Sequence, residues 1–254
     1  MFSTTHLIWI LICIAIVTLL TIVSIKCKFS FKTSTIIICA IIGVSEITKI
    51  MYSMKPAASS GMVIRAGALP FHLCSIMIFV FAYLMFGKNE KTKEIIKSFT
   101  VPICLLGGVL AIIIPTSGVG FAQVSAYQCF IYHASMIWYG LYLYITGQAK
   151  LGLKEYARNL IILFVLAVIV IWINGALQQY DTNFFFLVRP PMEGLPIINL
   201  NNGWYVYFIT LITLAFVLIG LVHLPYIIKQ IIAKQKSKQN ADNAANDIEK
   251  TPHE

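Results

Sequence analysis

The chain has 254 residues, of which 59% are hydrophobic and 11% charged, with a formal net charge of +9. Soluble domains average ~45–50% apolar and ~25% charged residues, and a soluble fold of this length could not bury so much apolar surface. The composition therefore excludes a soluble domain. The long unbroken apolar runs differ from the alternating segments of ~10 residues that build a membrane β-barrel. The predicted class is an all-α polytopic membrane protein.

Seven apolar runs reach the ~20 residues that a helix needs to cross a bilayer. They cover residues 6–26, 34–54, 67–87, 97–116, 123–147, 157–177 and 203–228. The first run is interpreted as a retained helix, because residues 1–8 carry no basic residue of the kind that opens a signal peptide. We therefore predict a seven-helix transmembrane domain over residues 1–228. The polar tail, 229–254, lacks aromatic residues and is predicted to be a disordered cytoplasmic segment.

Basic residues predict the orientation. Most of the 19 Lys and Arg residues follow the first, third, fifth and seventh runs, whereas the opposite connections carry only Lys55, Arg65 and Arg189. Because Lys- and Arg-rich loops face the cytoplasm, the N-terminus is expected outside and the C-terminus inside, in the plasma membrane. This distribution argues against a nucleic-acid partner. It leaves membrane lipid as the expected partner, and no pattern in the chain sets an oligomeric state.

The second run contains "GVSEITKIMY", in which Glu46 and Lys49 lie three residues apart. Residues at this spacing share a helix face and can form an ion pair. Ionisable residues inside a span are costly, so they indicate a functional site by default. A purely structural role, pinning this helix to its neighbours, is the alternative.

The third run opens with "LPFHLCSI". Pro70 suits the first turn of a helix, and Cys74 would lie near the helix N-terminus, whose amides favour a thiolate. In a regular helix, His72 and Cys74 would point to roughly opposite faces. His72 is therefore expected at the mouth of a site, and the base for Cys74 is expected from another helix.

The fifth and sixth runs add three polar residues. Gln128 lies about one turn into its helix, and His133 lies near mid-membrane in "FIYHASMIWYGLYLY". Asn174 comes at the outer end of the sixth run, before an aromatic, Pro-rich connection. Cys129 is interpreted as a packing residue.

Depth is the property that these residues share. All are placed in the outer half of the membrane, although they come from four different helices: Glu46, Lys49, His72, Cys74, Gln128, His133 and Asn174. Structural polar residues would scatter over both halves. The clustering predicts one pocket that opens outward.

Three motifs, in this order, carry a resemblance: "LPFHLCSI", "FIYHASMIWYGLYLY" and "FFFLVRPPMEGLP". Together they resemble the bacterial YwaF-type integral membrane proteins, a group similar to eukaryotic transmembrane protein 164. That relative is regarded as an acyltransferase that moves fatty acyl groups between phospholipids. The resemblance implies that Cys74 is a nucleophile and His133 its base.

Three functions stay open at this level. The first is an intramembrane acyltransferase or hydrolase, with Cys74 and His133 as catalytic residues and Gln128 or Asn174 as donors to an oxyanion. The second is a non-enzymatic binder or transporter of a small solute or lipid. The third is a structural membrane protein. No cofactor is expected, and no metal, because no pair of residues has convincing ligand spacing.

Overall fold

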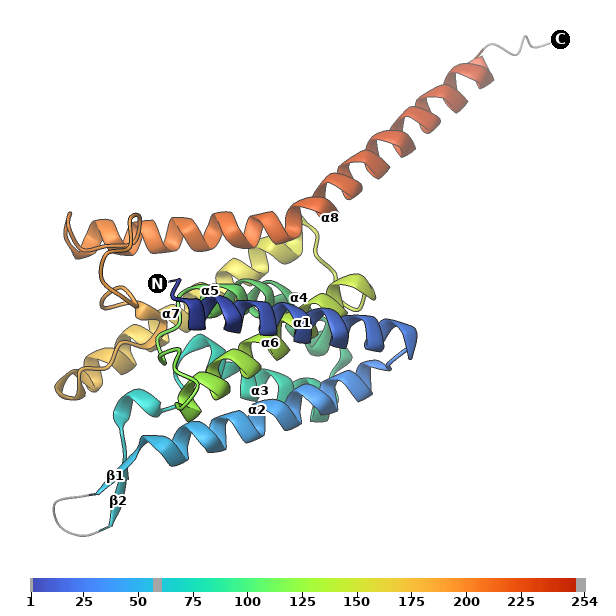
Figure 1. The fold of residues 1–254 in the computed structure, drawn as a ribbon. Helices are drawn as coiled ribbons and strands as arrows, with labels where there is room; N and C mark the ends of the chain where they lie inside the picture. Colours follow the sequence, from blue (N-terminus) through green and yellow to red (C-terminus); the bar gives the residue numbers. More distant parts are fainter. Residues whose placement is uncertain (1, 57–60, 250–254) are drawn as a thin grey trace.

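The computed structural model describes residues 2–56 and 61–249, and the fold is mostly helical (Figure 1). Each of the seven apolar runs forms a helix. Five helical segments in the described part are long and apolar enough to cross a membrane: Thr4–Lys26, Phe31–Ser53, Glu90–Ile113, Leu153–Ala176 and Trp204–Ser237. The chain is therefore a multi-pass, helical membrane protein.

Helix α6 (Val124–Ile145) lies at the centre of the bundle. It packs against α1 (Thr4–Lys26), α2 (Phe31–Ser53) and α5 (Gly108–Ile113), and more than half of its side chains are buried (Figure 1). Its aromatic and polar composition suits this position, because its neighbours are protein rather than lipid. Hydrogen bonds from α6 reach Thr35 on α2 and Ser24 on α1.

The third helix is shorter than predicted. Helix α3 covers Leu73–Phe86, 14 residues, and is preceded by the 3-10 turn η1 (Ala66–Ala68). The prediction of a continuous span from residue 67 was wrong. Pro70 explains the late start, because proline pushes the residue before it, Leu69, out of the helical region. Leu69 has φ −57° and ψ 149°, and the helix begins only after His72.

The fourth run contains an irregularity. Helix α4 (Glu90–Pro102) passes through a π-helical turn, η2 (Ile103–Gly107), into α5. The turn starts directly after Pro102, which has no N–H to continue the helical ladder. Such π-bulges occur frequently at functional sites. Here Ile103 and Gly107 face the cavity that is described below.

The connections after α2 and α7 also differ from simple loops. The strands β1 (Met54–Pro56) and β2 (Met62–Ile64) pair antiparallel after α2, which the sequence did not indicate. Between α7 (Leu153–Ala176) and α8 (Trp204–Glu249), two 3-10 turns, η3 (Gln178–Tyr180) and η4 (Phe184–Phe186), form a compact loop.

The C-terminal tail forms helix rather than the expected disordered segment. Helix α8 continues to Glu249, changes direction near Pro225 and extends away from the bundle (Figure 1). Residues 229–249 contain no Gly or Pro, so the chain carries no helix breaker there. Residues 250–254 lie outside the described part of the chain.

Candidate functional site

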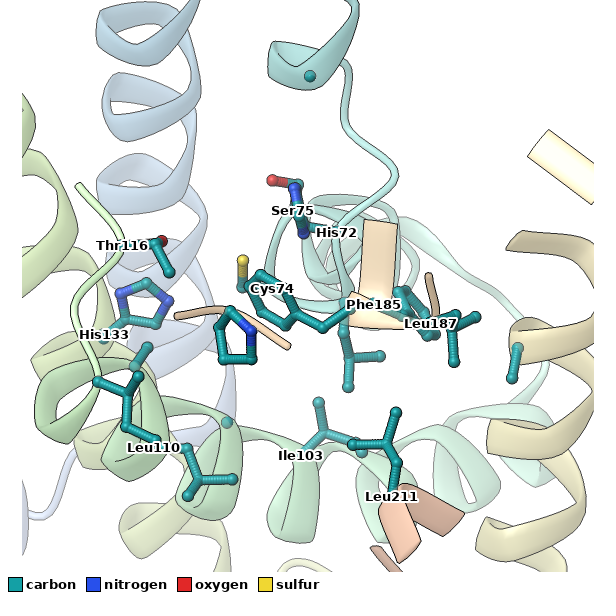
Figure 2. Close-up of a pocket in the computed structure, with 18 of the residues that line it drawn as sticks. His72, Cys74, Ser75, Ile103, Leu110, Thr116, His133, Phe185, Leu187 and Leu211 are labelled. Carbon is teal, nitrogen blue, oxygen red and sulfur yellow. The ribbon is translucent and has the colours of Figure 1, made fainter. Parts of the chain in front are cut away.

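A cavity of about 1060 Å³ lies between α2, α3, α6, the 103–117 segment, α7, α8 and the loop that follows α7 (Figure 2). Six of the seven predicted site residues line it: Glu46, Lys49, His72, Cys74, Gln128 and His133. They come from α2, the start of α3, and α6, which are distant in sequence. The rest of the lining is mostly apolar.

Asn174 is the predicted site residue that does not line the cavity. Its side chain is buried behind the loop, where Oδ1 accepts from the Phe184 amide at 2.9 Å and Nδ2 donates to the Phe184 carbonyl at 3.0 Å. Asn174 thus fastens the loop to the end of α7. Both polar groups of the Asn174 side chain are therefore occupied by backbone.

Cys74 occupies the second position of α3. His72 precedes the helix with φ −70° and ψ 149°, and the helical backbone bonds begin with Ile76 N to His72 O at 2.9 Å. The amides of residues 73–75 therefore belong to the unpartnered first turn, which carries partial positive charge. The Cys74 thiol therefore lies beside the partial positive charge of this helix end.

His72 does not follow helical phase, because its backbone is extended. The opposite-face argument thus does not apply, and His72 and Cys74 both line the cavity. The His72 ring packs against the rings of Phe184 and Phe186, with centroids 5.1 and 5.5 Å apart. His72 therefore contacts the loop that covers this end of the cavity.

His133 is held by its own helix. Its Nδ1 lies 2.7 Å from the carbonyl oxygen of Cys129 and 3.6 Å from the Cys129 sulfur. A carbonyl oxygen only accepts, so Nδ1 carries the proton and a neutral ring has its lone pair on Nε2. Figure 2 shows His133 and Cys74 on neighbouring walls of the cavity. The two side chains are not joined by a direct hydrogen bond.

A polar cluster joins α2 to α3 at the same end. Lys49 Nζ lies 2.6 Å from Glu46 Oε2 and donates to Ser75 Oγ at 2.7 Å, and Ser75 Oγ donates to Glu46 Oε1 at 3.0 Å. All three residues line the cavity. The predicted i,i+3 pair is therefore present, and Ser75, which no sequence pattern indicated, completes it.

Further hydrogen bonds fix the walls. Gln128 Nε2 donates to Ser45 Oγ at 2.7 Å, and its Oε1 accepts from Tyr52 at 3.3 Å. The Tyr132 hydroxyl donates to the carbonyl oxygen of Cys74 at 2.6 Å, which locks α6 to the start of α3. The one signal in the chain that could have identified Tyr132 is its position beside His133.

The loop after α7 lies over the cavity and is held in an unusual conformation. Phe185 and Phe186 have φ of 58° and 56°, a region that bulky residues rarely adopt. Asn183 bonds to the backbone of Val188 and Arg189, and Arg189 pairs with Asp181 at 2.6 Å. Figure 2 shows the Phe185 ring projecting into the cavity beside Cys74.

No group of three or more His, Cys, Asp or Glu residues in the described part of the chain is arranged to hold a metal ion. The site instead combines a thiol at a helix N-terminus, an imidazole with a defined tautomer and a large apolar chamber. The fold and this site define a polytopic helical membrane protein with an internal cavity whose wall carries a cysteine and a histidine.

Comparison with known families matches residues 1–223 to the TMEM164 family, and the chain belongs to that family. The match covers every residue that has been placed at the cavity. No curated protein and no solved structure matches the chain. The narrower likeness to the YwaF-type bacterial group stays a prediction.

Proposed function

We propose that the protein is an intramembrane acyl-transfer enzyme in which Cys74 is the nucleophile and His133 the general base. The observation that carries the proposal is the placement of both residues on one cavity, with the His133 Nδ1 proton engaged by the Cys129 carbonyl. This leaves Nε2 as the only ring atom that can accept a proton. The proposed substrate is an ester of a membrane lipid.

The reaction would proceed in two balanced halves. His133 Nε2 takes the Cys74 proton as the sulfur attacks the ester carbonyl, and the tetrahedral adduct expels an alkoxide that takes this proton from the imidazolium. The result is a thioester on Cys74 and a free lysolipid alcohol. A second alcohol, or water, then reverses the same steps and receives the acyl group. Direct contact between Cys74 and His133 is expected to form when substrate is bound, since such bonds tighten in the complex.

The developing oxyanion needs donors. The first-turn amides of α3 lie beside the Cys74 side chain, and one hydrogen of Gln128 Nε2 is not used by Ser45. Asn174 is a poor candidate because Phe184 occupies both of its polar groups. Gln128 and the α3 amides are therefore the proposed oxyanion donors.

Cys129 is the alternative nucleophile, because its sulfur lies 3.6 Å from His133 Nδ1. That nitrogen already carries a proton directed at the Cys129 carbonyl, so it cannot accept another from the thiol. Cys129 is therefore the matched control for Cys74.

The proposed orientation places this chemistry in the outer half of the bilayer. Seven spans, with the N-terminus outside and the C-terminus cytoplasmic, put the basic connections on one side in accord with the positive-inside rule. The plasma membrane is the proposed location. Labelling of single cysteines placed at Ser3 and Ser237 with a membrane-impermeant maleimide, in intact cells, tests the orientation: only the first should react.

The proposed activity is tested with the purified full chain in lipid vesicles, using a phospholipid with an alkyne-tagged acyl chain. The parent protein and the Cys129→Ala variant should each form a thioester with the tagged acyl chain, which hydroxylamine cleaves, and should transfer that acyl chain to a second lipid. Cys74→Ala should do neither, and His133→Gln should lose at least about a hundredfold in rate. Transfer by Cys74→Ala at the parent rate would end the proposal.

A non-enzymatic binder is the second candidate, and the buried Glu46–Lys49–Ser75 cluster on the cavity wall favours it. Such a protein would retain ligand when Cys74 is replaced but lose it in Glu46→Gln. Substrate-dependent flux in proteoliposomes, compared between these two variants, separates binder from enzyme.

A further inference from the structure

The cavity continues beyond its polar end. On α7 its lining residues recur at intervals of three and four, which places them on a single helical stripe: Leu160, Leu163, Phe164, Ala167, Val168 and Ile171. At 1.5 Å per residue this stripe is about 16 Å long. Every member is apolar, so the polar residues near Cys74 give way to a wholly apolar wall.

Helix α8 supplies the facing wall. Its lining residues begin at Phe208 and end at Leu218, a length of about 15 Å. The helices run in opposite directions, since Gln230 of α8 lies beside Gly152 at the start of α7, whereas Phe208 of α8 packs in the same cluster as Val170 near the other end of α7. Leu160 and Leu218 therefore lie toward one end, and Ile171 and Phe208 lie toward the loop and Cys74. We call the space between these two walls the α7–α8 channel.

The end of the channel away from Cys74 is closed. Asn159, next to Leu160, donates to the Ser98 carbonyl at 2.9 Å and lies 3.1 Å from His223 Nε2. His223 Nδ1 in turn lies 3.0 Å from the Leu151 carbonyl. Ser98, Asn159 and His223 are completely buried. These bonds hold α4, α7 and α8 together, so a cluster of buried, hydrogen-bonded polar side chains closes this end of the channel.

The side of the channel is open. Phe164 and Phe216 both line it, yet 58% and 45% of their surfaces are exposed. Both belong to helices that are long and apolar enough to cross the membrane. The exposed side therefore faces lipid, and a hydrocarbon chain can enter sideways without crossing a polar surface.

We propose that the α7–α8 channel binds one acyl chain of the lipid whose ester is presented to Cys74, and that its sealed end limits the chain length. The inference rests on the proposed function for the position of the ester. The apolar lining, the lateral opening and the continuity with the Cys74 end select an acyl chain as the occupant. Lipid tails are as apolar as the lining, so selectivity arises from fit within the channel rather than from escape from water.

The test measures binding without turnover. The full chain carrying Cys74→Ala is incubated in vesicles with phospholipids bearing a photoactivatable group at the end of an octanoyl or an oleoyl chain. Ala167→Trp and Ala215→Trp would fill the channel from opposite walls. Val165→Trp and Val217→Trp place the same ring on the outer faces of the same helices, where both residues are exposed and neither lines the channel.

The oleoyl probe should cross-link to α7 and α8 near Leu160 and Leu218 in the Cys74→Ala protein and in both controls. In Ala167→Trp and Ala215→Trp its yield should fall about fivefold or more, the factor expected from modest overpacking. Retained labelling by the octanoyl probe would show that these variants are folded. Leu160→Ala, which enlarges the sealed end, should admit a longer chain than the parent accepts.

Equal oleoyl labelling in the channel and control variants, or cross-links that map away from α7 and α8, would overturn the proposal that the α7–α8 channel binds an acyl chain. If acyl transfer by the parent persists in that case, the proposed function survives alone. If the channel labels as expected but the parent transfers no acyl group, the acyl-chain site stands and the enzymatic proposal fails.

Discussion

The cluster formed by Glu46, Lys49 and Ser75 allows a quantitative prediction for Glu46→Gln. The side chains of Glu46 and Lys49 are only 7% and 15% exposed, and their charged atoms lie 2.6 Å apart. Glutamine keeps an oxygen that accepts from Ser75, so the substitution removes the charge and little else. Lys49 is then left as an unpaired cation at the cavity wall.

Breaking a buried ion pair by removing one partner costs ~3–5 kcal/mol. Lys49 is slightly exposed to the cavity, where water can enter, so we expect a smaller loss of about 2 kcal/mol in the free energy of unfolding. Lys49→Met should cost a similar amount, because it strands the Glu46 carboxylate. The double variant should lose less than the sum, since neither charge is left unpaired.

Equilibrium unfolding in mixed detergent micelles, applied to the parent, both single variants and the double variant, measures the coupling. The matched control is Glu90→Gln, which removes the acidic partner of Lys93 at 3.1 Å in an i,i+3 pair where Glu90 is 73% exposed. That change should cost at most about 0.5 kcal/mol. A Glu46→Gln protein as stable as this control would refute the buried-pair reasoning. A double variant that is stable but has lost ligand would assign the pair to binding.

Two further substitutions, one of them with a matched control, test packing and hydrogen bonds around the cavity. In Gly108→Ala the new Cβ would lie 2.6 Å from Ile137 Cγ1 and 2.9 Å from the His133 carbonyl oxygen. Helix α5 must then move away from α6, which should lower the free energy of unfolding by ~1–3 kcal/mol. The control is Gly107→Ala, whose new Cβ would have no atom within 4 Å and should leave the free energy of unfolding unchanged in the same assay. Asn174→Leu leaves the buried amide and carbonyl of Phe184 unpaired, so hydrogen exchange at that amide should accelerate at least about tenfold. Unchanged exchange would show that the loop is held without Asn174.

Positions along the apolar runs predicted that residues of different helices would lie together. Counting residues along each apolar run placed Glu46, Cys74 and His133 at the same level, and the structure places all three on one cavity. The position of a residue along its apolar run is written in the chain, and it predicts which residues of neighbouring helices lie at similar levels. That is why separate helices could be related without knowledge of their packing.

Rotation about a helix axis was not predictable in the same way. Asn174 turns toward Phe184, because its direction depends on how the loop folds back. His72 was assigned to the face opposite Cys74, yet the backbone at His72 is extended and both residues line the cavity. Local phase fails wherever a proline delays the start of a helix.

Helix α6 shows why His133 stands apart from the other polar residues around it. Gln128 and Tyr132 bond to α2 and to the start of α3, and Trp138 and Tyr139 bond to α1 and α2. Each of these side chains uses its polar group to hold another part of the bundle. Among the described residues, His133 bonds only to Cys129 of its own helix, through Nδ1. Nε2 is therefore not needed for assembly, and its lone pair lies at the wall of the cavity without a structural partner, which the proposed role of His133 as a general base requires.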